Sequence, residues 1–309
     1  MFAIIGIIVV FGAVVGGYLL EHGNLRVLVQ PAELLIIAGA GGGTVLIANP
    51  LHVLKEIAGG LKGVIQGSPF TRARYLASLK LAYQLLNKAR RQGLMSLESD
   101  VEDPDKSQIF SQDPEFLKDP RVRHFFCDSM RMAISGVEAF ELDQLIETDL
   151  EVSHHDATQP VASLTTVADS LPGLGIVAAV LGVVITMGAL GGPPEQIGHK
   201  VAAALVGTFL GVLLCYGLVG PIASNMGKIA DARRAYLNVL KVLIISFLKG
   251  TAPILAVEAA RRAVPGHVRP TFQELEEACR GHSSSPASSP SETEAPPPEP
   301  EAQAASSGA

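Results

Sequence analysis

The chain has 309 residues, of which 48% are hydrophobic and only 17% are charged, and its mean hydropathy is +0.33. This composition is typical of integral membrane proteins and disfavours soluble enzyme classes. The formal net charge of −6 comes largely from an acidic stretch at residues 98–119 and from the C-terminal tail, and no basic stripe suited to nucleic acid is present.

Four stretches of the chain contain no charged residue and are expected to cross the bilayer. They are Phe2–Leu20, Leu34–Ala48, Leu171–Leu190 and Val201–Ser224. Spanning the hydrocarbon core takes about 20 apolar residues, which the third and fourth stretches meet clearly. The first has no basic residues before it and no convincing cleavage site after it, so we expect it to be retained.

The second stretch is the shortest, and a glycine triplet at residues 41–43 interrupts it. It can span only if its ends extend, which places Glu33 at the membrane boundary. On this interpretation no carboxylate lies deep in the bilayer, and Glu33 is the nearest. Either the protein transports nothing, or a partner supplies the ionisable group.

The region between the second and third stretches is too long for a connector and is expected to be a helical domain. Large apolar residues recur at helical spacing over Arg74–Arg91 and again over Val122–Leu150. The overall prediction is an all-α integral membrane protein with four transmembrane helices and a helical cytoplasmic domain. Its expected parts are a membrane hairpin (1–50), a cytoplasmic helical domain (51–169), a second membrane hairpin (170–226), a C-terminal helical region (227–281) and a disordered Ser/Pro/Ala/Glu-rich tail (282–309).

Basic residues gather in the loops on one side of the predicted spans. Four lie in Leu51–Tyr75 and four follow the fourth span, whereas the turns 21–31 and 191–200 have one each. The positive-inside rule therefore places both termini and the 51–169 loop in the cytoplasm.

Small residues and two prolines mark the third and fourth spans. Gly175, Ala178, Ala179 and Gly182 lie about one helical turn apart, and the fourth span has Gly207 and Gly211, a pattern that lets helices approach closely. Such patterns are also common in membrane helices without a special role.

Pro172 and Pro221 are expected at the same depth, toward the cytoplasmic face, where they could form a hinge. Pro172 could equally be a first-turn proline, whereas Pro221 disrupts the fourth helix and frees a carbonyl. Thr208 and Thr186 could line a pore or merely bond back to their own helices. Tyr216 could fill a groove between helices.

No catalytic or metal-binding constellation is apparent. The three cysteines lie far apart, and the adjacent His154 and His155 would point about 100° apart on a helix and rarely share a metal. We therefore expect no metal, no cofactor and no enzymatic activity. Arg90, Arg91 and Glu98 flank a turn after the first cytoplasmic helix, where a solvated charged end is the ordinary interpretation.

Four separated segments, in the right order, resemble the MotA family, the A-subunits of the bacterial flagellar stator within the MotA/TolQ/ExbB proton-channel superfamily. They are KARRQGLMSLESD (88–100), DSLPGLGIVAAVLGVV (169–184), ALVGTFLGVLLCYGLVGP (204–221) and VEAARRAVP…RPTFQELEE (257–277). The resemblance covers about residues 1–280 and does not include the tail.

The resemblance implies a homo-oligomer of A-subunits in the inner membrane, five around two MotB-like B-subunits, whose transmembrane aspartate binds the ion. Ion flow then produces torque on the rotor switch protein FliG. By the same resemblance, the rotor-facing residues are Arg90 and Glu98, the coupling prolines Pro172 and Pro221, and the ion-pathway residues Thr208 and Ala179. Accessory candidates are Asp169, Arg91 and Tyr216.

The resemblance also bears on the ion and on the alternatives. Sodium-using relatives have a threonine seven residues past the third-span proline, where this chain has Ala179, and this favours protons. An ExbB/TolQ-type energy transducer is the nearest alternative, although the early hairpin argues against it. A solute transporter would need a polar site inside the membrane, which the sequence does not reveal.

Overall fold

The computed structural model describes residues 2–188, 191 and 193–280. Within these ranges the chain is helical and contains no strand, which confirms the all-α prediction. Four helices are long and apolar enough to cross a membrane, two near the N-terminus and two in the middle of the chain. The predicted C-terminal tail and Leu190, the predicted end of the third span, lie outside the described residues.

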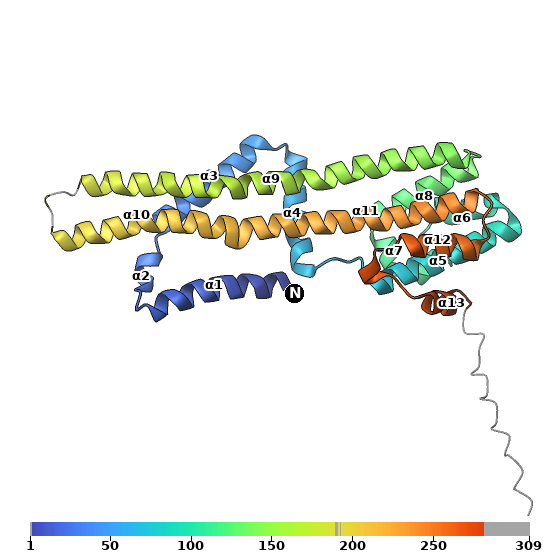
Figure 1. Cartoon of the computed structure of the whole chain (residues 1–309). Coiled ribbons are helices and arrows are strands. Elements are labelled where there is room, and N and C mark those ends of the chain that lie inside the picture. Colours follow the sequence, from blue (N-terminus) through green and yellow to red (C-terminus); the bar gives the residue numbers. More distant parts are fainter. Residues whose placement is uncertain (1, 189–190, 192, 281–309) are drawn as a thin grey trace, which may run out of the picture.

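Two very long helical segments dominate the molecule and run side by side in opposite directions (Figure 1). The first is α9 (Ala139–Met187). The second consists of α10 (Pro194–Leu214), the π-helical turn η3 (Cys215–Val219) and α11 (Gly220–Leu248). At 1.5 Å per residue they extend about 70–80 Å, more than twice the hydrocarbon thickness. The predicted domain boundaries at 169/170 and 226/227 therefore fall inside continuous helices.

The N-terminal quarter forms the other membrane helices, α1 (Phe2–Leu20) and α3 (Pro31–Ala48), with the short α2 (Leu25–Leu28) between them. Helix α3 packs along α9, whereas α1 contacts the rest of the chain mainly at η3 and α4. No residue of α1 is buried. Helix α4 (Leu51–Gln66) then runs across the long helices rather than along them (Figure 1).

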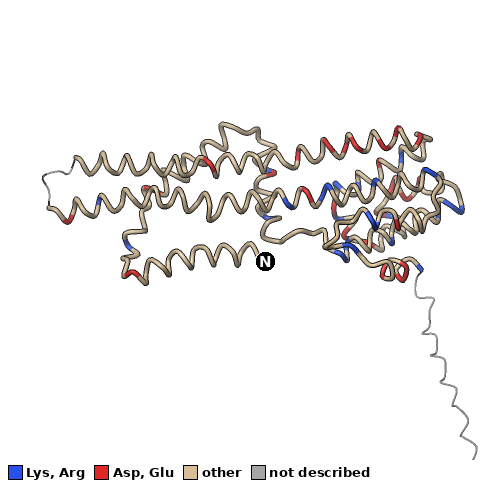
Figure 2. Tube along the Cα trace, in the orientation of Figure 1, with Lys and Arg blue, Asp and Glu red and all other residues tan. Residues whose placement is uncertain are grey.

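The remaining helices gather at the far end of α9 and α11 and form, with those ends, what we call the extramembrane domain. They are α5 (Arg72–Gln92), η1 (Leu94–Leu97), α6 (Glu98–Glu102), η2 (Phe110–Gln112), α7 (Pro114–Lys118), α8 (Pro120–Ile134), α12 (Pro253–Ala263), η4 (Gly266–Val268) and α13 (Phe272–Arg280). Charged residues concentrate in this part of the molecule (Figure 2). Such a distribution suits a domain in water attached to a bundle in lipid.

The periodicity of residues 74–91 corresponds to α5, as predicted, but that of residues 122–150 does not form one helix. Gly136 has φ +89°, a left-handed conformation that ends α8, and α9 begins after it. Phe140, the second residue of α9, is 70% exposed. The apolar spacing continued across the break because α8 and α9 both contribute to the same core.

A buried polar cluster joins α5, α8 and α11 near the base of the extramembrane domain. Arg74 lies 2.8 Å from Asp119 and within 5.2 Å of the ring centre of Tyr236. Burial raises the pKa of Tyr236 to about 12, and its hydroxyl shares a hydrogen bond with Ser78. Because an unpaired buried arginine would be strongly unfavourable, the carboxylate of Asp119 and the ring of Tyr236 hold these three helices in register.

Candidate functional site

The contact between α9 and α10 is a seam of small residues, here called the glycine seam: Gly175, Ala178, Gly182, Ala204, Gly207 and Gly211. A methyl group built at Gly211 would lie 2.5 Å from the carbonyl oxygen of Leu171, and one at Gly175 would lie 2.8 Å from that of Gly207. The backbones therefore touch, as the spacing of small residues predicted. The seam also fixes which residues of the two helices lie at the same level.

Glu33 lies against this seam, in a position that the sequence did not predict. Its carboxylate approaches Gly207 so closely that a methyl group there would be 2.7 Å from Oε2, and the residue is only 7% exposed. Oε2 has no hydrogen-bond partner among the described residues. The sequence placed Glu33 at the membrane boundary; the structure shows it in the first turn of α3, with its carboxylate turned in against the seam. Pro31, a typical first residue of a helix, was the available signal that α3 begins before Glu33 and orients its side chain.

The two threonines of the predicted spans differ in their hydrogen bonding. The hydroxyl of Thr186 donates to the carbonyl oxygen of Gly182 at 2.8 Å, the ordinary bond back to its own helix. Thr208 is half-buried beside the seam, and within the described residues its hydroxyl has no such bond. Ala179 lies on α9, across the seam from α10, and its amide nitrogen is close to Gly207. Thr208 thus keeps a free hydroxyl for another ligand.

Pro172 and Pro221 do not lie at the same depth, contrary to the prediction. The seam places Leu171, the neighbour of Pro172, beside Gly211, which is near the middle of the fourth charge-free stretch. Pro221 follows Gly211 by ten residues, and this separates the two prolines by about 15 Å along the helix axis. The prediction failed because it assumed that the start of the third charge-free stretch and the end of the fourth lie at the same membrane surface.

The two prolines also have different local structures. Pro172 lies inside the continuous helix α9 and is not a first-turn proline. Pro221 is the second residue after the π-helical turn η3. Because Pro221 has no amide hydrogen, it leaves a preceding carbonyl without its helical donor, and π turns mark such interruptions. The irregular helix predicted at Pro221 is therefore present.

Asp169 and Tyr216 lie on the outside of the same region. Asp169 is exposed and close enough to Cys215 to act on it electrostatically, so it too lies alongside the fourth charge-free stretch. Tyr216 is 73% exposed and lines a cavity of about 210 Å³ that also contacts α1 and Pro221. It borders a groove but does not fill it.

The charged residues predicted to face a rotor lie at the opposite end of the molecule. Arg90 and Arg91 are exposed in the last turn of α5, and Glu98 is exposed at the start of α6. Behind them Lys88 and Asp100 form an ion pair of 2.6 Å, which joins α5 to α6 and holds the turn between them. Arg90 and Glu98 therefore lie exposed on either side of this ion-paired turn, in the extramembrane domain and far from Thr208 and the prolines.

Together these features define a multi-span helical membrane protein in which two long helical segments connect an intramembrane seam to a charged extramembrane domain. The profile described as "Motility protein A N-terminal" matches residues 4–93, and that of the "MotA/TolQ/ExbB proton channel family" matches residues 118–235. Motility protein A of Escherichia coli (strain K12) is 41% identical over 281 residues, covering 91% of this chain and 95% of that protein. The chain belongs to the motility protein A family.

Solved structures share the fold. The structure of C. jejuni MotAB aligns with a TM-score of 0.73 at 19% identity, covering 87% of this chain and 98% of that one. The flagellar MotAB stator complex from Bacillus subtilis aligns with a TM-score of 0.71 at 24% identity and the same coverage. The match of the N-terminal profile disfavours the ExbB/TolQ-type alternative.

Proposed function

We propose that this chain is the A-type subunit of a bacterial flagellar stator, and that with a B-type subunit it forms a proton channel that drives torque on the rotor. Membership of the motility protein A family carries the assignment. The protein is a multi-pass inner-membrane protein with, we propose, both termini in the cytoplasm, as the basic residues of α4 and α11 indicate.

Large apolar faces of the bundle support assembly with other membrane chains. Val180 and Val184 on α9 are 56% and 62% exposed, and Leu205 on α10 is 67% exposed. Part of this surface faces lipid, and part of it would contact neighbouring A-subunits and the B-subunit. We propose five A-subunits around two B-subunits.

The ion pathway in this proposal passes the glycine seam. The aspartate of the B-subunit would bind a proton, and the free hydroxyl of Thr208 would hydrogen-bond to it or to water. The methyl group of Ala179 provides no oxygen ligand, which suits a proton better than dehydrated sodium. Asp169, exposed near Pro172, is a second proton-exchanging group on the path.

Helix α9 provides the mechanical connection. From Pro172 to its start at Ala139 it is one continuous helix of about 50 Å that also contains Pro160, so a bend of about 5° at Pro172 would move the far end by about 4 Å. Pro221 and η3 allow α11 to follow. The movement would carry Arg90, Arg91 and Glu98 against FliG. The energy for it would come from the ion, since one charge crossing the membrane provides about 2.3 kcal/mol per 100 mV.

A matched pair of threonine variants tests the pathway in cells that lack their own A-type subunit. Thr208→Val should slow tethered-cell rotation and lower proton flux, whereas Thr186→Val should change little because that hydroxyl already bonds to its own helix. Equal effects of the two variants would contradict the role of Thr208. Proton flux from the purified chain without a B-subunit would contradict the divided channel and favour a self-sufficient transporter.

A further inference from the structure

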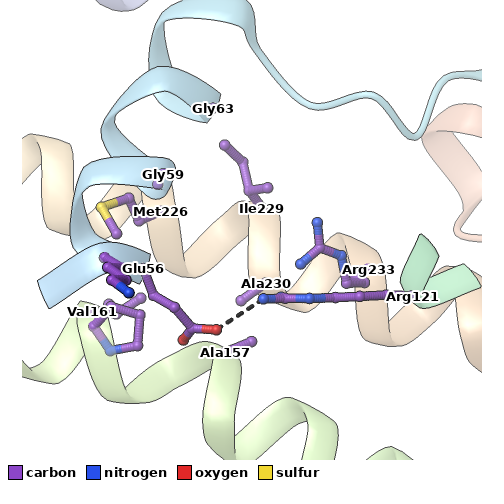
Figure 3. Close-up of a pocket in the computed structure, with 13 residues that line it drawn as sticks. Glu56, Gly59, Gly63, Arg121, Ala157, Val161, Met226, Ile229, Ala230 and Arg233 are labelled. Carbon is purple, nitrogen blue, oxygen red and sulfur yellow. Dashed lines mark hydrogen bonds and ion pairs between the residues drawn. The ribbon is translucent and has the colours of Figure 1, made fainter. Parts of the chain in front are cut away.

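A second cavity, unrelated to the glycine seam, lies where α4 crosses the two long helices. It has a volume of about 360 Å³ and is bounded by α4, α9 and α11, with Arg121 of α8 closing one side (Figure 3). The space exists because α4 presents glycines to it. A methyl carbon built at Gly59 or at Gly63 would meet nothing within 4 Å.

The charges that line this cavity do not balance. Lys55, Arg121 and Arg233 are cationic, and Glu56 is the one carboxylate among the lining residues. Glu56 accepts a hydrogen bond of 2.8 Å from Arg121, which leaves Lys55 and Arg233 as excess positive charge. An anion of one or two negative charges would complete the site.

Among the residues that line this cavity, Arg233 has a buried side-chain nitrogen, Nε, without a hydrogen-bond partner within the described chain. The guanidinium of Arg233 lies near that of Arg121 (Figure 3), and burial followed by this repulsion lowers its pKa. The nearby Asp119 already accepts from Arg74. Two guanidinium groups at such close range are stabilised when an anion lies between them.

The position of the cavity indicates the source of the anion. Met226, which lines it, follows the last charge-free span by two residues, and α4 begins three residues after α3 ends. Helix α4 is amphipathic, with Leu51 69% and Ile65 55% exposed, and it crosses the bundle as a helix lying in the membrane surface would. Apolar Met226 and Ile229 line the same cavity as the basic groups.

We propose that this cavity binds the phosphate-bearing headgroup of an anionic phospholipid from the adjacent leaflet, with its acyl chains along the apolar side of α4 and α11. Basic pockets between helices at the membrane surface bind such headgroups. The inference depends on insertion in a membrane but not on the stator assignment. Bound lipid would join α4, α8 and α11 at the base of the extramembrane domain.

Native mass spectrometry of the purified full-length chain, released from nanodiscs, tests this proposal. Nanodiscs of phosphatidylglycerol or cardiolipin are compared with nanodiscs of phosphatidylcholine. We expect retention of the anionic lipids, and an apparent Kd about five-fold weaker in Arg233→Gln and weaker again when Lys55→Gln is added. No preference for anionic lipid would overturn the proposal.

Arg234→Gln is the matched control, because it removes the same charge from the next residue, which faces Glu147 at 4.0 Å and not the cavity. Equal losses in Arg233→Gln and Arg234→Gln would show general surface attraction and overturn the site. Gly63→Leu fills the cavity without changing charge and should also weaken binding. Unchanged binding in this variant, with normal circular dichroism, would place the lipid outside the cavity.

Inorganic phosphate distinguishes the two possible sources of the anion. Titrated into the detergent-solubilised chain, it should raise the Tm far less than cardiolipin at equal concentration, because it lacks the acyl chains that contact Met226 and Ile229. An equal rise in Tm from the two would assign the cavity to free phosphate and overturn the lipid proposal.

Discussion

Replacing Gly211 by alanine is the most direct test of the glycine seam. The new methyl carbon would lie 2.5 Å from the carbonyl oxygen of Leu171, 2.9 Å from the Cα of Gly175 and 3.2 Å from its nitrogen. Ordinary contacts of this kind are about 3.4 Å, so α10 would have to move about 0.9 Å away from α9. All three obstacles are backbone atoms, and no side chain can rotate to relieve them.

The magnitude follows from two opposing effects. Overpacking a close contact costs about 1–3 kcal/mol, whereas alanine stabilises a helix by about 1 kcal/mol relative to glycine. We therefore expect a net loss of up to about 2 kcal/mol, and a Tm lower by several degrees. The displacement occurs at the level of Pro172, so rotation should suffer more than assembly.

Thermal unfolding of the purified protein, followed by circular dichroism, provides the measurement, and rotation of tethered cells provides the second readout. Gly12→Ala is the control, because a methyl group there meets nothing within 4 Å and only the gain in helix stability remains. We expect this control to keep or raise the Tm. A similar rise in Gly211→Ala would refute the inference that the backbones touch.

Four further predictions concern other parts of the molecule. Pro221→Ala restores the missing amide donor after η3, so assembled stators should rotate slowly, and normal swimming would rule out a hinge there. Arg90→Glu should impair rotation but leave copurification with the B-subunit intact, and loss of the complex would show a structural role instead. Glu33→Gln, similar in shape, should assemble in the membrane, whereas Glu33→Lys should not, and equal yields would contradict the burial of this side chain. Hydrogen bonds from Arg261 hold the pKa of Glu258 at about 2, below the usual 4.5, so its stabilisation of about 1–2 kcal/mol is complete above pH 4.5 and lost as pH falls toward 2. Chemical denaturation of Glu258→Gln across this range should lack that part of the acid dependence.

The amino-acid sequence by itself determined the elements of this protein. Runs of about 20 apolar residues specify membrane helices because a helix satisfies its backbone hydrogen bonds within a single segment long enough to cross the lipid. The small residues of the third and fourth spans likewise predicted a close helix contact, since only such residues let backbones touch. The exposed positions of Arg90 and Glu98 could also be predicted, because the helical spacing of apolar residues over Arg74–Arg91 ends there and a turn follows.

Only the tertiary structure decided how these elements line up. The depth of Pro172 relative to Pro221 depends on the register of two antiparallel helices, and that register is set by where Gly175 meets Gly211. The composition of one helix does not indicate which residues of the neighbouring helix lie beside it at the same depth. The burial of Glu33 and the basic cavity beside α4 depend in the same way on contacts between residues more than a hundred positions apart.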